Sequence, residues 1–484
     1  MSRSNLVIIR KYFFCSMILK NVSIASYTNI FKEIEQKKDK LEYGITFAHV
    51  LNLTKLNFMK LFSKIMLFSI SILTVFSCQE ASNEITLTSE NMVSDLQRTL
   101  IEAKEGAVII MPEGSYEFNR PISLNDIPKV TLKGAGMKKT ILSFKEQIEG
   151  GEGMIVKSID GLTLEGFTIA DSKGDALKVQ DCKNVVIRAV ETTWTGGKLA
   201  TNGGYGLYPV TCTNVLMEDC EASFAMDAGI YLGQSTNAVV RNNYVHNNVA
   251  GIEIENTINA DVYGNKAVEN TGGLLIFDMP DLPQANGNNI KVHDNMVENN
   301  NGENFSPEGI VVHILPPGTG VLIMAHKNIE LFNNEIKGHN TVSIAINSWQ
   351  FTGRTYKSEA YDPFCHGLNI YNNKIAMGEG NTDVTTDFGK LFTALGQGKP
   401  IGIAYDGVIN PTHFNEDGTM KTEHKICIRE NGEVPFMNLN AYKAMGENGL
   451  DMTKLASAIE MDASRFDCEV APLNLGDFST WLAE

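Results

Sequence analysis

Short apolar segments separated by polar turns recur along residues 161–371 of this chain. Each copy opens with a small polar residue, a spacer and Asn, followed by alternating apolar residues, as in Cys182-Lys-Asn-Val-Val-Ile and Cys212-Thr-Asn-Val-Leu-Met. The key position of the copies is occupied by Gly161, Asn184, Asn214, Asn237, Asn259, Asn289, Asn328 and Gly367. The successive spacings are 23, 30, 23, 22, 30, 39 and 39 residues. A unit of 22–23 residues with insertions of about 8 or 16 is typical of a stacked solenoid.

The residue types in the segments indicate β-structure. Short runs of Val and Ile lie between Asn and Gly turns, and helical periodicity is scarce along the 484 residues. Alternation along a strand sends one set of side chains inward and the next outward. We therefore predict an all-β chain folded as a parallel β-helix, a solenoid in which each repeat forms one coil.

Stacking places equivalent residues of neighbouring coils in columns about 4.8 Å apart. One column holds five asparagines, for which we predict an amide ladder: Asn243, Asn265, Asn295, Asn334 and Asn373. Cys182 and Cys212 share another column, and because stacked parallel side chains rarely reach disulfide torsions, we predict two buried free thiols. An outward column alternates in charge and predicts a surface ion-pair ladder: Glu165, Arg188, Glu218 and Arg241.

The first coil of a β-helix needs a cover, because an exposed sheet end invites pairing with another chain. Ser89 can cap a short amphipathic helix over residues 90–104, with Val93, Leu96 and Leu100 on one face. We predict that this N-terminal capping helix opens a parallel β-helix that spans residues 89–382.

The repeat pattern dissolves near residue 383, so residues 383–484 are expected to form a small mixed C-terminal cap. Its patterns predict a helix over 387–395, a strand over 401–405 and a helix over 451–459. Cys427 and Cys468 are the cysteines of this region. Beyond an export signal they would meet an oxidising compartment, so we expect a disulfide between them.

Residues 59–77 resemble a bacterial lipoprotein signal peptide. Met59-Lys-Leu-Phe-Ser-Lys supplies a basic start, and an apolar run too short to span a bilayer leads to Val75-Phe-Ser-Cys78. The resemblance implies that Cys78 is lipidated and is followed by a linker over 78–88. Simple cleavage near Cys78 is the alternative. The protein is then expected in the cell envelope, periplasmic or at the outer-membrane surface, and bound to the membrane only through the lipid anchor.

Residues 1–58 show no sustained pattern. We interpret them as upstream sequence from an early start codon, with Met59 the true start, in preference to a cytoplasmic domain.

The net charge of the chain limits the classes of molecule that it is expected to bind. The first 77 residues hold 11 basic and 4 acidic residues of the chain's 41 and 57, which leaves 30 against 53 and a net charge of −23. Such a surface disfavours nucleic acid and anionic lipid, since phosphate binding needs clustered cations. Acidity also keeps a secreted protein soluble, and it could suit cation-mediated binding of an acidic polymer.

Residues 85 to about 380 resemble the right-handed parallel β-helix proteins of the pectin-lyase-like superfamily. The likeness lies in the coils, the N-terminal helix and the segment Gly134-Ala-Gly-Met-Lys-Lys-Thr140. Within the superfamily the chain is similar to secreted bacterial β-helix repeat lipoproteins and, at the repeat level only, to periplasmic proteins linked with copper insertion. The resemblance implies the fold, whereas the superfamily holds lyases, hydrolases, epimerases and non-catalytic proteins.

One segment can be compared with a motif of alginate C5-epimerases, Tyr-Gly-x-Asp-Pro-His-Asp. The chain has Tyr205-Gly-Leu-Tyr-Pro-Val-Thr211 there, so the catalytic Asp, His and Asp are replaced by Tyr208, Val210 and Thr211. Proton abstraction beside a uronate needs a base and a group that neutralises the carboxylate. Val210 supplies neither, and Tyr208 could act as a base only if a cation lowered its pKa. Epimerase chemistry by that route is not expected.

Alignment of the third strand of each coil locates a candidate groove. The first outward column is predicted as Lys178, Tyr208, Tyr231, Glu253, Leu275, Val311 and Ala345, and the second as Gln180, Val210, Gly233, Glu255, Phe277, His313 and Asn347. Insertions at 278–283, 315–320 and 348–356 leave near this strand, so their loops should wall the groove, and loops on a rigid scaffold usually carry function.

Candidate residues in the groove fall into three groups. Tyr208, Lys178 and His313 are the candidate catalytic residues. The candidate substrate-binding residues offer aromatic rings, acids and a cation: Tyr231, Glu253, Glu255, Trp349, Arg354 and Tyr356. Glu253 and Glu255 alternate onto one face, a spacing suited either to paired carboxylates or to a Ca²⁺ site with Asn256. Each of these residues could equally be an ordinary solvated residue on an exposed sheet, and His313, as a lone histidine, an ordinary surface residue.

Three functions remain open. The first is an enzyme that binds and cleaves or modifies acidic polysaccharide, most simply a lyase. The second is a non-catalytic glycan-binding or scaffold protein on the cell surface. The third is a periplasmic accessory to a metal or redox system, with a secreted cytochrome-like partner. No His/Cys cluster with metal-ligand spacing is visible along the chain, which weakens the copper relationship.

Overall fold

A computed structural model describes residues 83–446 and 449–482, all within one compact unit that spans Asn83–Glu484. The predicted upstream segment 1–58, the signal peptide 59–77 and the lipidation site Cys78 lie outside the described residues. Of the helices in the described ranges, none combines the length and the apolar character needed to cross a membrane.

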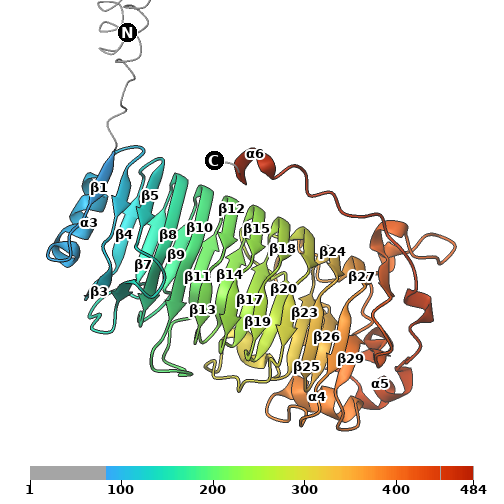
Figure 1. Ribbon diagram of the computed structural model, residues 1–484. Coiled ribbons are helices and arrows are strands. Elements are labelled where there is room, and N and C mark those ends of the chain that lie inside the picture. The colour runs from blue at the N-terminus through green and yellow to red at the C-terminus, as the bar shows by residue number, and fades with distance from the viewer. Residues whose placement is uncertain (1–82, 447–448, 483–484) are drawn as a thin grey trace, which may run out of the picture. The chain divides into compact units, whose positions relative to one another are not determined.

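The unit is a stack of coils whose strands form three all-parallel faces (Figure 1). The strands of the first face pair in this order: β1 (Glu84–Thr86), β2 (Val108–Ile110), β5 (Val130–Lys133), β8 (Asp160–Ala170), β10 (Lys183–Thr193), β12 (Thr213–Glu218), β15 (Thr236–Arg241), β18 (Ile258–Tyr263), β21 (Asn288–His293), β24 (Lys327–Phe332), β27 (His366–Tyr371) and β30 (Ile426–Arg429). β1 shows that the predicted linker 78–88 contains a strand of the first face.

The second face continues around the corner of each coil. β8 and β10 are long enough to belong to both faces. The other strands of the second face are β3 (Gly114–Glu117), β6 (Thr140–Ser143), β13 (Glu221–Ser223), β16 (Tyr244–His246), β19 (Lys266–Val268), β22 (Met296–Glu298), β25 (Glu335–His339) and β28 (Lys374–Met377).

The third face is a separate sheet of eleven strands. In order it contains β4 (Ile122–Asn125), β7 (Met154–Lys157), β9 (Leu177–Gln180), β11 (Tyr205–Val210), β14 (Ala228–Gly233), β17 (Ala250–Glu255), β20 (Gly272–Phe277), β23 (Thr319–Met324), β26 (Val342–Asn347), β29 (Ile401–Tyr405) and β31 (Phe436–Asn438). This sheet carries the candidate site on its outer side.

The key position of the repeat is a left-handed turn residue. The six asparagines there have φ between 51° and 61°, and Gly161 and Gly367 have φ of 85° and 65°. Asn and Gly are the residues that adopt this conformation most readily. The asparagine side chains also bond from coil to coil, for example from Asn214 Nδ2 to Asn184 Oδ1 at 2.8 Å. Backbone conformation and stacking therefore both account for the recurring Asn.

The predicted amide ladder is confirmed. Each Nδ2 donates to the Oδ1 of the next coil at 2.9–3.0 Å along Asn243, Asn265, Asn295, Asn334 and Asn373, and the ladder continues to Asn431. A second ladder, of Asn248, Asn270 and Asn300, ends on His339 Nε2. Both ladders are buried, so they satisfy the polar groups of the turns within the core.

Cys182 and Cys212 are buried free thiols, as predicted. On the outside, the Arg188 Nε and Arg241 Nη2 atoms both lie 2.5 Å from the Glu218 carboxylate, which confirms the ion-pair column. The column then continues as stacked rings, in the order Tyr263, His293, Phe332 and Tyr371.

Helix α3 (Met92–Glu102) covers the first coil, packed beside β3 and β4 (Figure 1). Its buried face is Met92, Leu96 and Leu100, whereas Val93 is 48% exposed. The predicted face was therefore wrong at one position, because Met92, four residues before Leu96, faces the core in place of Val93. Its N-cap is Asn91 in place of the predicted Ser89.

The C-terminal region continues the solenoid beyond residue 382, since β29, β30 and β31 add strands to the existing sheets. α4 (Asp387–Leu395) and β29 form where the pattern predicted a helix and a strand, and α5 (Met452–Ala458) matches the predicted second helix. Cys427 on β30 is joined to Cys468 by a disulfide. The remaining short elements are η4 (Pro411–His413), η5 (Thr422–His424), η6 (Ala441–Lys443), β32 (Met445–Gly446), β33 (Gly449–Leu450), η7 (Ser464–Phe466) and α6 (Ser479–Leu482).

Candidate functional site

A cavity of about 310 Å³ lies on the outer side of the third sheet. β14, β17, β20, β23 and β26 form its floor, and α4 with the loops before β23 and after β26 forms its walls. Most of the lining is apolar: Leu275, Phe277, Met279, Ile310, Val311, Val312, Ile314, Leu315, Leu322, Met324, Phe351, Phe388 and Phe392. The predicted groove therefore exists, but it is narrower and more apolar than the sequence pattern suggested.

The strand register corrects one part of the prediction. β20 pairs with β23 so that Leu274 aligns with Val321, and the outward positions after it are Leu322 and Met324. Val311 and His313 instead belong to η2 (Val311–Ile314), a short 3-10 helix within the loop. The loop departs before the strand in this coil, so the assignment of His313 to the strand face was wrong.

Three carboxyl groups line the polar end of the cavity. Glu253 and Glu255 come from β17, where alternation sends both outward, and Asp227 precedes β14 in the neighbouring coil. All three are buried, with exposed fractions of 2%, 9% and 7%. Burial and mutual repulsion raise the pKa of Asp227 to about 7, and burial raises the pKa of Glu255 to about 7. The same two causes hold the pKa of Glu253 well above its ordinary range.

Three tyrosine rings pack beside these carboxyl groups. The ring centroids of Tyr205, Tyr208 and Tyr231 lie 4.6–4.8 Å apart in pairs. Tyr205 is hydrogen-bonded to Asp227, and Tyr231 to Glu255, which partly offsets the rise in the pKa of each carboxyl group. The Tyr231 ring lies over Gly233, where any side chain would collide with it. Glycine at this position therefore allows Tyr231 to reach Glu255.

The predicted catalytic trio is brought together only in part. The Lys178 Nζ atom lies 5.0 Å from the centroid of the Tyr208 ring, so these two residues meet. The pKa of Tyr208 is raised to about 12 by burial and nearby carboxylates, the opposite of what a tyrosine base requires. The His313 ring nitrogen Nδ1 donates to the Ser306 carbonyl at 2.7 Å and does not line the cavity.

Of the predicted substrate-binding residues, some line the cavity and others lie outside it. Tyr231, Glu253 and Glu255 line the cavity. Trp349 opens η3 (Trp349–Thr352) but is 3% exposed and packs on Tyr361, so it belongs to the core beneath the loop. Arg354 lines a second depression with His313 beside α4, and Tyr356 stacks edge-on against Tyr361 outside the cavity. The loop folds back on itself, which the pattern of residues did not indicate.

Asn256 does not join the two glutamates as a metal ligand. Its amide donates to the Met279 and Gln284 carbonyls and accepts from the Met279 backbone N–H. Asn256 has φ of 46°, so the chain turns after Glu255 and directs the amide toward the loop. The residue therefore fixes the start of the 278–287 loop. Calcium binding through Glu253 and Glu255 stays a prediction.

Several contributors to the cavity were not found from the sequence, among them Asp227 and two phenylalanines of α4. Asp227 lies in the turn before its strand, and such turns vary from coil to coil. Phe388 and Phe392 come from α4, more than 100 residues after β17. An acidic residue just before a repeated strand is only a weak sequence signal for a site residue, and it is the one signal that pointed to Asp227. The sequence carried no signal that α4 covers this part of the sheet.

The arrangement is suited to proton transfer. Burial and the neighbouring acids raise the pKa of Glu253 and favour its neutral form, while Glu255 and Asp227, each with a pKa of about 7, change charge near neutral pH. Carboxyl groups whose pKa values are separated by their environment are the usual means by which one site supplies both an acid and a base. Most of the cavity lining is apolar, and electrostatic interactions are stronger in such surroundings than in bulk water.

Comparison with known proteins agrees with the coil architecture. A model for the right-handed beta helix region matches residues 189–375. Similar solved structures include the mannuronan C-5 epimerase AlgE4 A-module of Azotobacter vinelandii, with 16% identity over 66% of this chain and 87% of that chain and a TM-score of 0.46. Endopolygalacturonase I of Stereum purpureum has 13% identity over 61% and 96%, with a TM-score of 0.37. DFA-IIIase of Arthrobacter chlorophenolicus has 13% identity over 67% and 92%, with a TM-score of 0.41.

A comparison with curated proteins found no match. The family match and the three parallel faces together establish a right-handed parallel β-helix. The fold prediction is thereby confirmed.

Proposed function

We propose that the cavity is the active site of a carbohydrate-active enzyme and that its carboxyl groups cleave a glycosidic bond by general acid–base catalysis. The observation that supports this most is the gathering of Asp227, Glu253 and Glu255, all buried, in a largely apolar cavity. A group of buried acids destabilises the folded chain, so its presence beside a cavity favours a functional reason.

Each carboxyl group has a role that its surroundings favour. Glu253 is protonated and donates its proton to the glycosidic oxygen, so that the leaving sugar departs as an alcohol. Glu255 takes a proton from the water whose oxygen bonds to the anomeric carbon. Tyr231 orients Glu255 through its hydroxyl, and Asp227 keeps the pKa of Glu253 high.

The walls favour sugars whose C–H faces pack on apolar and aromatic side chains. Phe277, Phe351 and Phe388 supply such surfaces in the cavity. A second candidate is a lyase that acts on an acidic glycan, which Lys178 favours because a uronate carboxylate needs a neutralising cation. The surrounding acids oppose a strongly anionic ligand, so hydrolysis of a neutral or weakly charged glycan is the better supported function.

We also propose that the protein is exported and lipid-anchored through Cys78. The Cys427–Cys468 disulfide supports an oxidising compartment. Metabolic labelling with an alkyne fatty acid tests the anchor. Label that is present in the native chain and lost from Cys78→Ser is the expected result, and equal label in both would refute it.

The enzymatic proposal is tested with purified protein on a panel of neutral and acidic glycans. Release of reducing ends measures hydrolysis, and ultraviolet absorbance of unsaturated products measures lysis. We expect reducing ends without unsaturation and a loss of at least 100-fold in kcat for Glu253→Gln, in line with the usual contribution of general acid catalysis. Glu298→Gln, on β22 and outside the cavity, is the matched control. Binding of a glycan without any product would show a binding protein and overturn the proposal.

A further inference from the structure

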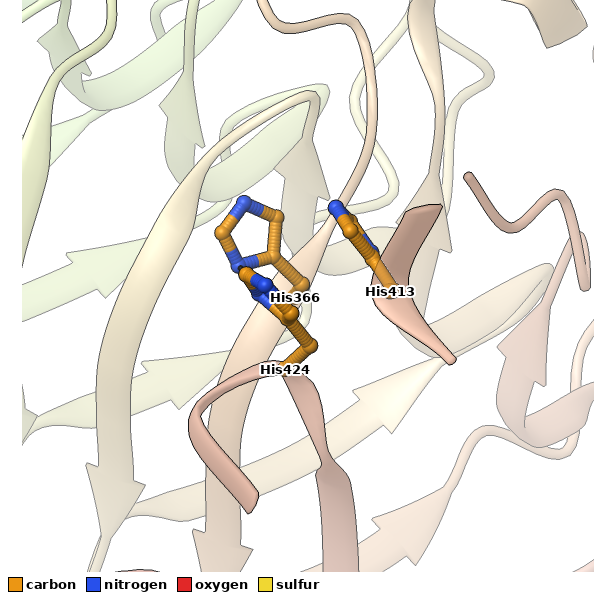
Figure 2. Close-up of side chains that lie close together, drawn as sticks. All are labelled: His366, His413 and His424. Atoms are coloured by element: carbon orange, nitrogen blue, oxygen red, sulfur yellow. Dashed lines mark hydrogen bonds between the residues drawn. The ribbon is translucent and has the colours of Figure 1, made fainter. Parts of the chain in front are cut away.

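Three histidines from separate segments meet at the edge of the first face (Figure 2). His366 is the first residue of β27, His413 ends η4 and His424 ends η5. One ring nitrogen of each lies within 4.8 Å of the others. In the described ranges, this is the one group of three or more His, Cys, Asp or Glu side chains with ligand atoms that close together. None of the three lines the cavity described above.

We propose that His366, His413 and His424 bind one divalent transition-metal ion of the class that prefers imidazole ligands, Zn²⁺ or Cu²⁺. Neutral imidazole nitrogen is a favoured ligand of both ions. The site is independent of the proposed enzymatic function, because it lies on a different face and shares no residue with the cavity.

The hydrogen bond to Asp362 selects the metal-binding form of His366. The Asp362 Oδ2 atom lies 2.9 Å from His366 Nε2. An ionised carboxylate can only accept, so Nε2 carries the proton, and in the neutral ring Nδ1 then holds a free lone pair. That Nδ1 atom faces His424 Nδ1 at 3.0 Å. A carboxylate that holds the far nitrogen of a ligating histidine is the usual outer-sphere arrangement at metal sites.

The distances are close to those that a metal ion requires. Tetrahedral ligands at about 2.0–2.1 Å from zinc have nitrogen atoms roughly 3.3 Å apart. The 3.0 Å between His366 and His424 already meets this distance, and the upper limit of 4.8 Å within the group leaves a shift of about 1.5 Å for the third ligand. The His413 ring is stacked on His424 at 3.9 Å between centroids, so one of these rings turns when the ion enters.

Burial distinguishes this group from surface histidines. His366 and His413 are 6% and 5% exposed, whereas His424 is partly exposed and leaves one side of the group open to water. Three protein ligands with an open fourth position are typical of zinc sites that hold a water molecule.

The ion would tie a surface loop to the coil. Between His413 and His424 the chain is mostly exposed and bonds mainly within itself, through the bridge between Phe414 and Met420 and the hydrogen bond from the Lys421 backbone N–H to the His413 carbonyl. A metal that joins both ends of this loop to β27 restricts it, because binding energy becomes folding energy for the segment it orders.

Titration calorimetry with Zn²⁺ and with Cu²⁺ on the metal-free purified protein is the main test. We expect one ion per chain and at least a 10-fold loss of affinity for His424→Gln, the least buried of the three. His246→Gln is the matched control, since His246 is another partly buried histidine that meets an acid but lies outside the group. For Asp362→Asn we expect a loss of roughly 10–100-fold, the usual effect of changing such a partner.

Two further measurements separate a metal site from histidine packing. The Cu²⁺ electron paramagnetic resonance spectrum should show nitrogen couplings that weaken in His424→Gln. Trypsin cleavage at Lys421 and Lys425 should slow on addition of Zn²⁺ in the native chain and not in His424→Gln. Binding at less than one ion per chain, equal affinity in His424→Gln and the native chain, or a spectrum without nitrogen couplings would overturn the proposal.

Discussion

The raised pKa of Glu255 links the stability of the chain to pH. Its pKa is about 7 in the folded chain, because burial disfavours the charged form, against about 4.5 for an exposed glutamate. A carboxyl group whose pKa is raised on folding stabilises the fold fully below the unfolded value. That stability is then lost as pH rises through the folded value. The protein should therefore be less stable at pH 8 than at pH 5.

The size of this effect follows from the two pKa values. Integrating the proton linkage from pH 5 to pH 8 gives a loss of about 2.5 kcal/mol in the free energy of unfolding from Glu255 alone. The Glu255→Gln variant cannot ionise, so it should escape this loss. Because the Glu255 charge also raises the pKa of Asp227, the variant should in addition lower the contribution of that residue.

Urea unfolding at pH 5 and pH 8, followed by fluorescence and circular dichroism, measures the difference. We expect the native chain to lose at least about 2 kcal/mol more than Glu255→Gln between the two pH values. The groups common to both proteins cancel in this comparison. Glu298→Gln, a glutamate outside the cavity, should behave like the native chain. Equal pH dependence in the native chain and in Glu255→Gln would refute the assignment of a buried, neutral carboxyl group at this position.

Two further predictions concern the scaffold. Asn295→Ala removes one rung of the buried ladder. The Asn265 backbone N–H and side-chain Nδ2 lose the oxygen to which they donate, and Asn334 Oδ1 keeps only the Asn295 backbone N–H, so chemical denaturation should show a loss of about 3–5 kcal/mol in the free energy of unfolding. A loss below about 1 kcal/mol would mean that water replaces the rung. Cys427→Ser opens a loop with a sequence separation of 41, for which loop closure entropy gives a loss of about 4 kcal/mol, and reduction of the native chain should lower the thermal midpoint to that of the variant; no change in either would show that the cap is held by other contacts.

The fold could be predicted from the sequence because the repeated residue has a local physical cause. A left-handed turn favours Asn or Gly once in every coil, and the same Asn bonds to its neighbours, so the key position recurs at nearly every turn. The spacing of these positions then gave the coil length, and the side-chain alternation gave the inner and outer columns. Both amide ladders follow from this register, and the second ends on His339 in place of a further asparagine.

The error at His313 shows where local pattern fails. The segments that begin at Ile310 and at Gly320 have the same alternation of apolar residues. Gly309 precedes the first segment, and Gly320 is the first residue of the second. In the coil itself, glycines such as Gly251 and Gly273 lie so close to the carbonyl of the next coil that no side chain fits. Gly309 has open space around it and a φ of 98°, so it serves a loop turn. Only the contact between coils tells these glycines apart, and a single sequence does not record that contact.

The site itself depends on what interrupts the repeat. Every wall of the cavity comes from an insertion or from α4, and the three histidines come from one coil strand and a loop about 50 residues further on. A solenoid strand can vary little, since each residue must match its neighbours above and below, whereas an insertion leaves the stack and is free to fold over a face. Departures from the 22–23-residue unit were therefore the strongest functional signal in the chain. These insertions indicated which face carries the site. They did not indicate which side chains meet there, because that depends on how each loop folds back over the face.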